Sequence, residues 1–219
     1  MLKAVIYDMD GLIVDSEPWW RVAESNVFGR LSRSPSEADF ERMMGRQIKE
    51  VIQHWHSVAP WKNLVVEETQ KEILSEVARL VKENASLLPG VIESLEFFKR
   101  KGLAIALASS SPLHLIRDLM THYGLLNHFS IICSAEFESH GKPHPAVFMK
   151  AAQELGVDAQ DCLVLEDSFN GLISAKAARM KCIAVPEKGA FNQTRFDIAD
   201  LKISSLAEFS EEYWNELNR

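Results

Sequence analysis

Five short apolar segments recur along the chain without alternating between apolar and polar residues. Continuous apolar runs are typical of strands buried on both faces, as in a parallel sheet. The segments are residues 2–7, 103–108, 131–133, 163–165 and 183–185. Helical patterns lie between them, and this alternation of strand and helix predicts an α/β fold with a doubly wound parallel sheet.

Two of the helical patterns follow later strands. Residues 146–155 place their apolar side chains on one face, and Gly156 is a natural helix end. Residues 168–180 begin with Ser168, a residue type that caps helix N-termini. We therefore predict a helix over each range.

The first strand is separated from the second by about 95 residues of helical pattern. The predicted helices cover approximately residues 18–31, 36–44, 47–59 and 65–84. Helices inserted after the first strand would lie above the carboxyl ends of the strands, where open α/β sheets bind ligands. We expect a core of residues 1–14 and 88–219, and an α-helical cap of residues 15–87 that is placed to act as a lid.

Charge and composition exclude several classes of function. The 219 residues carry a net charge of −7, and lysine and arginine are not clustered densely enough to predict a nucleic-acid-binding face. The start of the chain lacks a signal-peptide pattern, and no apolar run approaches the ~18 residues of a membrane span. Cys133, Cys162 and Cys182 fit buried strand thiols in a reducing compartment. We expect a cytoplasmic protein without a nucleic-acid or membrane partner.

Two carboxylates leave the first strand together. Asp8 and Asp10 follow the apolar run, and positions i and i+2 of an extended chain point to the same face. Gly11 then allows a turn with an unusual φ or the close approach of a ligand. Such a pair can share a proton or bind a cation, with one member as nucleophile and the other as proton donor. A solvated acidic turn is the alternative.

Later strand ends add hydroxyl, lysine and acidic side chains. Ser109 and Ser110 end the second strand at the start of a helix, where phosphate binds readily. Lys142 stands among turn residues, and Glu166 and Asp167 end the fourth strand, where one carboxylate would face a ligand and the other support it. Because parallel strand ends share one edge of the sheet, these groups should converge. Acids with Ser and Lys suit Mg²⁺ and a phosphoryl group.

Four motifs follow one another along the chain: Asp8-Met9-Asp10-Gly11, Ser109, Lys142 and Glu166-Asp167. In type and order they resemble the four motifs of the haloacid dehalogenase superfamily. The helical insertion resembles the cap of that superfamily. Further segments resemble its β-phosphoglucomutase-like branch, and most closely the 2-deoxyglucose-6-phosphate and hexitol phosphatases: Asp15-Ser16-Glu17-Pro18, Leu88-Pro89-Gly90-Val91, Lys142-Pro143-His144-Pro145 and Leu165-Glu166-Asp167-Ser168. The resemblance implies a Rossmann-like core and a Mg²⁺-dependent phosphatase of small sugar or polyol phosphates, acting through an aspartyl-phosphate.

The resemblance also implies roles for the acidic residues. Asp8 would be the nucleophile, and Asp10 would protonate the leaving oxygen and then activate water. Asp8, the backbone carbonyl of Asp10 and Asp167 would hold Mg²⁺, with Glu166 binding it directly or through water.

The remaining site residues would bind the substrate, a small phosphorylated metabolite, in a monomeric protein. Ser109, Lys142 and the N–H group of Ser110 would hold the phosphoryl group. Arg46 lies in a predicted loop of the cap that reaches the active site in this branch; it could contact a sugar hydroxyl, a second phosphate or only solvent. The cap tryptophans more often build a small core than stack on a sugar, and Trp20 is among those nearest the first strand.

Three other functions compete with the phosphatase. Phosphosugar mutases of this branch carry a histidine in the first cap helix near Trp20, and this chain has none there. Dehalogenases lack the second acid of the first motif, so Asp10 argues against that activity. Non-enzymatic phosphoacceptor domains also use Asp, Ser/Thr, Lys and Mg²⁺, but they lack a helical cap. A phosphatase is therefore favoured.

Overall fold

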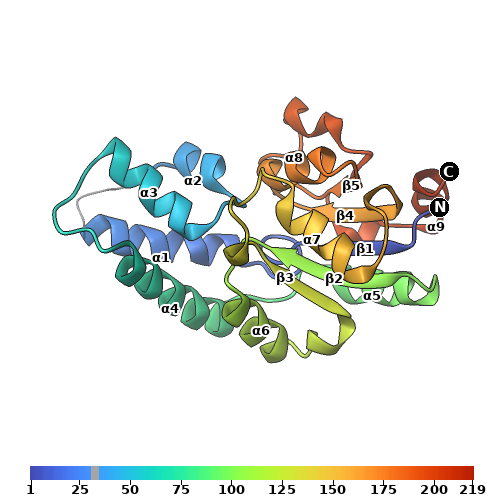
Figure 1. Cartoon of the computed structure of the whole chain (residues 1–219), viewed down its shortest axis with the longest axis horizontal. Helices are drawn as coiled ribbons and strands as arrows, with labels where there is room; N and C mark the ends of the chain where they lie inside the picture. Colours follow the sequence, from blue (N-terminus) through green and yellow to red (C-terminus); the bar gives the residue numbers. More distant parts are fainter. Residues whose placement is uncertain (31–34) are drawn as a thin grey trace.

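The computed structural model describes residues 1–30 and 35–219. A six-stranded sheet of order β3-β2-β1-β4-β5-β6 forms its centre, and each neighbouring pair is parallel (Figure 1). The strands are β1 Ala4–Tyr7, β2 Ala104–Ser109, β3 Ile131–Ser134, β4 Cys162–Glu166, β5 Lys181–Ala184 and β6 Leu201–Lys202. The predicted α/β fold with a parallel sheet is confirmed, and each of the five predicted strands is present. The sequence did not predict β6, because two residues are too few to make an apolar run.

Nine α-helices lie within the described residues. They are α1 Glu17–Arg30, α2 Glu37–Met43, α3 Ile48–Val58, α4 Val66–Asn84, α5 Val91–Arg100, α6 Leu113–His122, α7 Ala146–Leu155, α8 Phe169–Ala177 and α9 Glu211–Leu217. The predicted bounds of α7 are correct, and those of α1 to α4 agree to within one residue, except that residue 31 of the first predicted helix lies outside the described residues. The helix predicted to residue 180 ends at Ala177, because Arg179 has a left-handed φ of 63°.

The two faces of the sheet carry different apolar layers. Val5 and Tyr7 of β1 face a layer that includes α5, α6 and α9, whereas Ala4 and Ile6 face a layer that includes α7 and α8. The three cysteines belong to the second layer and are buried and free. Burial on both faces explains why the strands read as continuous apolar runs.

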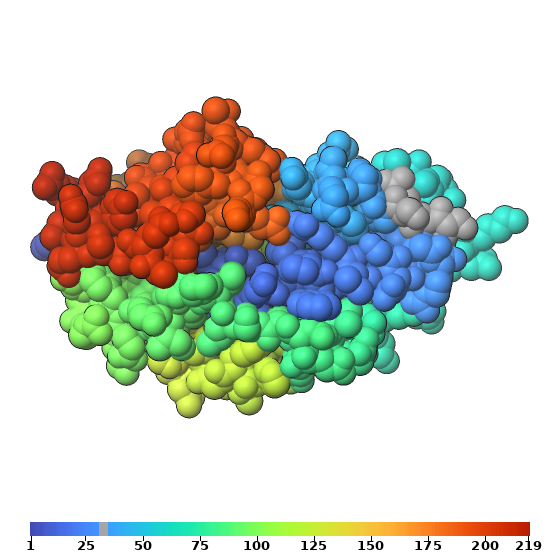
Figure 2. All heavy atoms as spheres, turned by 180° about the vertical axis from the view of Figure 1, so that it is seen from behind, coloured from blue at the N-terminus to red at the C-terminus, as the bar shows by residue number. Residues whose placement is uncertain are grey.

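Helices α1 to α4, here called the insert helices, follow β1 and lie beyond the carboxyl ends of the strands (Figure 1). Helix α4 packs against both α1 and α3, and it also contacts α6. Viewed from behind, the insert helices, coloured blue to teal, adjoin the rest of the chain (Figure 2). Their contact with the strand ends encloses the edge of the sheet where β1 lies between β2 and β4, the usual ligand position of this topology.

None of the helices in residues 1–30 and 35–219 has both the length and the apolar character needed to cross a membrane.

Candidate active site

Asp8 leaves the centre of the sheet at the end of β1. Its backbone N–H donates to the carbonyl of Leu165 in β4 at 3.0 Å, and its side chain is buried. Gly11 follows with a φ of +72°, and a Cβ atom at this position would overlap the carboxylate of Asp167. The predicted unusual φ is confirmed, and the turn requires glycine for both backbone and packing reasons.

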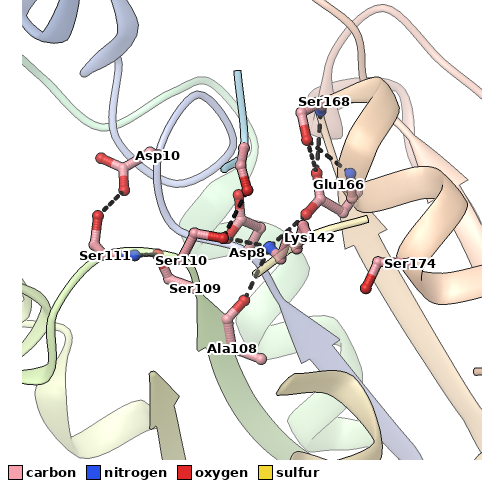
Figure 3. Close-up of polar contacts among 12 residues, drawn as sticks. Asp8, Asp10, Ala108, Ser109, Ser110, Ser111, Lys142, Glu166, Ser168 and Ser174 are labelled. Atoms are coloured by element: carbon pink, nitrogen blue, oxygen red, sulfur yellow. Dashed lines mark hydrogen bonds and ion pairs between the residues drawn. The ribbon is translucent and has the colours of Figure 1, made fainter. Parts of the chain in front are cut away.

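Lys142 joins two buried carboxylates. Its Nζ donates to Asp8 Oδ1 at 2.8 Å and to Glu166 Oε1 at 2.6 Å, and also to the carbonyl of Ala108 at 3.3 Å (Figure 3). Burial alone would lower the pKa of this ammonium, but Asp8 and Glu166 raise it above its ordinary value. The side chain is 1 % exposed, so a permanent positive charge lies directly beneath the end of β1.

Glu166 and Asp167 are neighbours with different surroundings. Glu166 uses Oε1 for Lys142, and its Oε2 accepts from the N–H and the hydroxyl of Ser168, each at 3.0 Å. Both carboxylate oxygens of Asp167 are buried and have no hydrogen-bond partner among the described residues. A buried carboxylate without partners is costly, so Asp167 is the member of the pair that needs a ligand.

The acidic cluster suits a divalent cation. Asp8, Glu166 and Asp167 each place a carboxylate oxygen within 4.8 Å of the others, and all three are buried. Burial, followed by the charge of Glu166, raises the pKa of Asp167 well above its ordinary range. Burial likewise raises the pKa of Asp8 to about 7, against the opposing effect of Lys142. One lysine does not balance three carboxylates, and hard oxygen ligands of this kind are those that Mg²⁺ prefers.

Asp10 occupies a different environment from Asp8. Its Oδ1 accepts from the hydroxyl of Ser16 at 2.7 Å and from Trp20 Nε1 at 2.8 Å, and its Oδ2 accepts from the hydroxyl of Ser111 at 2.7 Å. These donors come from the segment before α1, from α1 itself and from the loop after β2. Ser16 and Ser111 were not predicted as site residues, although the Ser-Glu-Pro and triple-serine segments containing them are visible in the sequence.

The serines at the end of β2 and directly after it have different partners. Ser109 is buried, and its Oγ accepts from the N–H of Ser111 at 3.0 Å. Ser110 donates from its hydroxyl to the carbonyl of Gly45 at 2.6 Å, and Gly45 lies between α2 and α3. This bond ties the insert helices to the edge of the sheet.

One pocket collects most of the predicted site residues. Its lining includes six of them: Asp8, Asp10, Ser109, Ser110, Asp167 and Arg46. Lys142 and Glu166 are not in the lining but lie behind Asp8, which they reach through the Lys142 ammonium. Trp20 also lines the pocket, whereas Trp55 is buried in the apolar core. Glu24 of α1 also lines the pocket and was not predicted from the sequence.

Known proteins resemble the chain over nearly its whole length. Residues 5–185 match the family model described as haloacid dehalogenase-like hydrolase. The chain is 41 % identical over 210 residues to hexitol phosphatase B of Escherichia coli (strain K12), covering 95 % of each protein. It is 32 % identical over 189 residues to a phosphorylated carbohydrates phosphatase of Thermotoga maritima, covering 83 % of this chain and 84 % of the relative.

Solved structures show the same fold. A β-phosphoglucomutase from Clostridium difficile aligns with a TM-score of 0.89 at 24 % identity, covering 100 % of this chain and 98 % of that one. CbbY from Rhodobacter sphaeroides, solved in complex with phosphate, aligns with a TM-score of 0.88 at 24 % identity over 100 % of both chains. The strand-end motifs, the parallel sheet and the family match agree with one another. The chain therefore belongs to the haloacid dehalogenase-like hydrolases.

Proposed function

We propose that the protein is a Mg²⁺-dependent phosphatase that hydrolyses small sugar or polyol phosphates, working as a monomer in the cytoplasm. The observation that carries this proposal is the buried Asp8–Lys142–Glu166 arrangement beside the unpartnered carboxylate of Asp167. The 41 % identity to a hexitol phosphatase supports the substrate class. We further propose that residues 15–87 act as the cap over this site and the remaining chain as the catalytic core.

Asp8 and Asp10 carry the two chemical steps of this proposal. An oxygen of Asp8 attacks phosphorus, the bond to the ester oxygen breaks, and Asp10 donates a proton to the departing sugar oxygen. Asp10 then takes a proton from a water molecule, whose oxygen attacks the aspartyl-phosphate and releases inorganic phosphate. Both aspartates return to their starting state, with Asp8 ionised and Asp10 protonated.

Asp8, Asp167 and the backbone carbonyl of Asp10 would hold Mg²⁺. When bound, the cation neutralises negative charge on the phosphoryl group during transfer. Glu166 fits a supporting role, because Lys142 and Ser168 already use both of its carboxylate oxygens.

Lys142, Ser109 and Ser110 would bind the phosphoryl oxygens. Lys142 lies 2.8 Å from the proposed nucleophile, so its charge acts where negative charge accumulates. Ser109 and Ser110 line the pocket at the carboxyl end of β2. Because the Ser110 hydroxyl donates to Gly45, the groups that would bind phosphate are the Ser109 hydroxyl and the N–H group of Ser110.

A panel of phosphate esters tests the substrate class. Purified protein with Mg²⁺ should release phosphate from hexitol and hexose phosphates faster than from phosphoglycolate or nucleotides, measured as kcat/KM. Absence of phosphate release from every sugar and polyol ester would refute the proposal. Conversion of β-glucose 1-phosphate into glucose 6-phosphate without free phosphate would instead identify a mutase.

The nucleophile and the cation have separate tests. Asp8→Asn should reduce turnover to background, and residual activity near that of the wild type would exclude Asp8 as nucleophile. EDTA should stop hydrolysis. Mg²⁺ should also raise the Tm of the wild type, because it binds the folded state, and Asp167→Asn should remove that shift. An equal shift in both proteins would exclude Asp167 as a ligand.

A further inference from the structure

Glu24 is a buried carboxyl group in the wall of the active-site pocket. It lies on α1, about one turn beyond Trp20, which contacts Asp10, and only 8 % of the residue is exposed. No hydrogen bond or ion pair joins it to another of the residues that the structure describes. Buried acids are almost always paired, so an unpaired one facing a pocket points to a ligand.

Two guanidinium groups line the same pocket and also keep an unused donor. The Nε atoms of Arg21 and Arg46 are buried, and neither has a hydrogen-bond partner among the described residues. The rest of the Arg21 guanidinium is engaged, since it donates to Glu187 at 2.8 and 2.9 Å and to Glu37 at 3.2 Å. Its charge is therefore already balanced, and its remaining capacity is for neutral acceptors, which the unused Nε–H group can bind.

The unused groups match hydroxyls better than a second anion. A hydroxyl both donates and accepts, so a polyhydroxyl chain can accept from the N–H groups of Arg21 and Arg46 while donating to Glu24. A second phosphate or carboxylate would instead need an unbalanced positive charge, and the charge of Arg21 is already paired with Glu187 and Glu37. The apolar part of the wall suits the carbon chain of the ligand and includes Phe40, Met43, Met44, Ile48 and Val51.

The ionisation of Glu24 agrees with this assignment. Burial raises the pKa of Glu24 to about 8, so the group is largely protonated at neutral pH. A neutral carboxyl group can both donate to and accept from a hydroxyl without burying a charge.

We propose that Glu24 is a specificity-determining residue that hydrogen-bonds a hydroxyl of the uncharged polyhydroxyl part of the substrate. This inference rests on the proposed phosphatase function and deepens it, because it assigns the non-phosphate half of the ester to a named group. Arg21 and Arg46 complete the same hydrogen-bonding wall.

The test compares two six-carbon esters that differ only in hydroxyls. The ratio of kcat/KM for a hexitol phosphate to that for n-hexyl phosphate should be well above one in the wild type. Glu24→Met, an apolar replacement of similar volume, should lower this ratio about tenfold or more, because losing one good hydrogen bond to a substrate hydroxyl has an effect of that size. Glu24→Gln, which retains hydrogen bonding, should keep the ratio within about threefold of the wild type.

Controls separate a specificity role from a general loss of structure. Ser25→Ala alters the neighbouring exposed residue of α1 and should leave the ratio unchanged. A ratio that is equal in Glu24→Met and the wild type would overturn the role of Glu24. If Glu24→Met does not fold, the wild type alone still tests whether the pocket recognises hydroxyl groups. Equal kcat/KM for the two esters would then overturn the proposal. A wild-type protein that hydrolyses neither ester would refute the phosphatase function itself, which is a different outcome.

Discussion

Asp8 and Asp10 are two residues apart in sequence but differ in their partners. Asp8 is buried against the ammonium of Lys142, whereas Asp10 is partly buried and accepts from three neutral donors. The charged partner favours an ionised nucleophile at Asp8 once a cation offsets the neighbouring acids. The three donors fix the orientation of the Asp10 carboxyl group beside the nucleophile, as a group that passes a proton to the leaving oxygen requires. The asymmetry between the two residues thus arises from their contacts.

Replacing Asp10 tests this division of roles. Asp10→Asn should lower kcat by about 10²–10⁴, the usual contribution of a positioned acid or base. Steady-state phosphate release gives kcat, and rapid quench shows whether formation or hydrolysis of the aspartyl-phosphate is slowed. Trp20→Phe is the matched control, because it removes one donor to Asp10 but keeps the carboxyl group; its effect should be clearly smaller. A near-wild-type rate for Asp10→Asn would exclude acid–base catalysis by Asp10.

At the scale of elements, the first turn of α8 shapes the acidic cluster. Ser168 caps the helix by accepting from the N–H of Gly171 at 3.0 Å, and it donates to Glu166. A Cβ atom at Gly171 would overlap the carboxyl group of Glu166. The end of β4 and the start of α8 therefore pack closely enough to hold Glu166 against Lys142, and only glycine leaves that space.

Gly171→Ala should displace Glu166 and disturb Lys142. We expect kcat to fall at least about tenfold, and overpacking of about 1–3 kcal/mol to lower the Tm by several degrees. Gly29→Ala in α1 is the matched control, because a Cβ atom there would have no neighbour within 4 Å. In a helix this change should raise stability by up to about 1 kcal/mol. Thermal unfolding and kcat of both variants provide the comparison, and an unaffected Gly171→Ala protein would contradict the packing argument.

At the scale of the whole molecule, the substrate pocket reduces the stability of the fold. Burial raises the pKa of Glu24 from an ordinary value of 4.5 to about 8, so the folded state binds this proton more tightly than the unfolded chain. Binding of this proton therefore stabilises the folded state relative to its form with an ionised Glu24. This stabilisation is fully present below pH 4.5 and is lost as the pH rises through about 8. The change is on the order of 5 kcal/mol for a shift of this size.

Glu24→Gln should remove this pH dependence. The Tm of the variant relative to the wild type should rise by about 5 °C or more between pH 5 and pH 8.5, because about 1 kcal/mol corresponds to about 2–4 °C in a chain of this size. Differential scanning calorimetry at several pH values measures the difference. Most other buried acids titrate alike in both proteins and cancel. Glu17, whose pKa is raised by burial and by neighbouring acids that include Glu24, adds to the difference in the same direction. A constant difference across this range would show that Glu24 ionises normally in the folded state.

The sequence by itself determined the type of fold and the set of chemical groups. Continuous apolar runs require a sheet covered on both faces, and helical periodicity located α1 to α4 and α7 to within one residue over the described chain. Those features are local, since they depend on the residues of one strand or helix. The motifs at the strand ends were also visible in sequence, because parallel strands bring their carboxyl ends to one edge.

Only the tertiary structure decided which groups are paired. The strand pattern alone left open which of Glu166 and Asp167 faces a ligand, and only the family resemblance implied Asp167. In the structure, Lys142 and Ser168 bind Glu166, and the oxygens of Asp167 have no partner among the described residues. The position of Glu24 depends on how α1 packs above the sheet, which its own helical pattern does not specify. Contacts of this kind join residues that are distant in sequence, and their energies depend on burial and orientation that no local pattern contains.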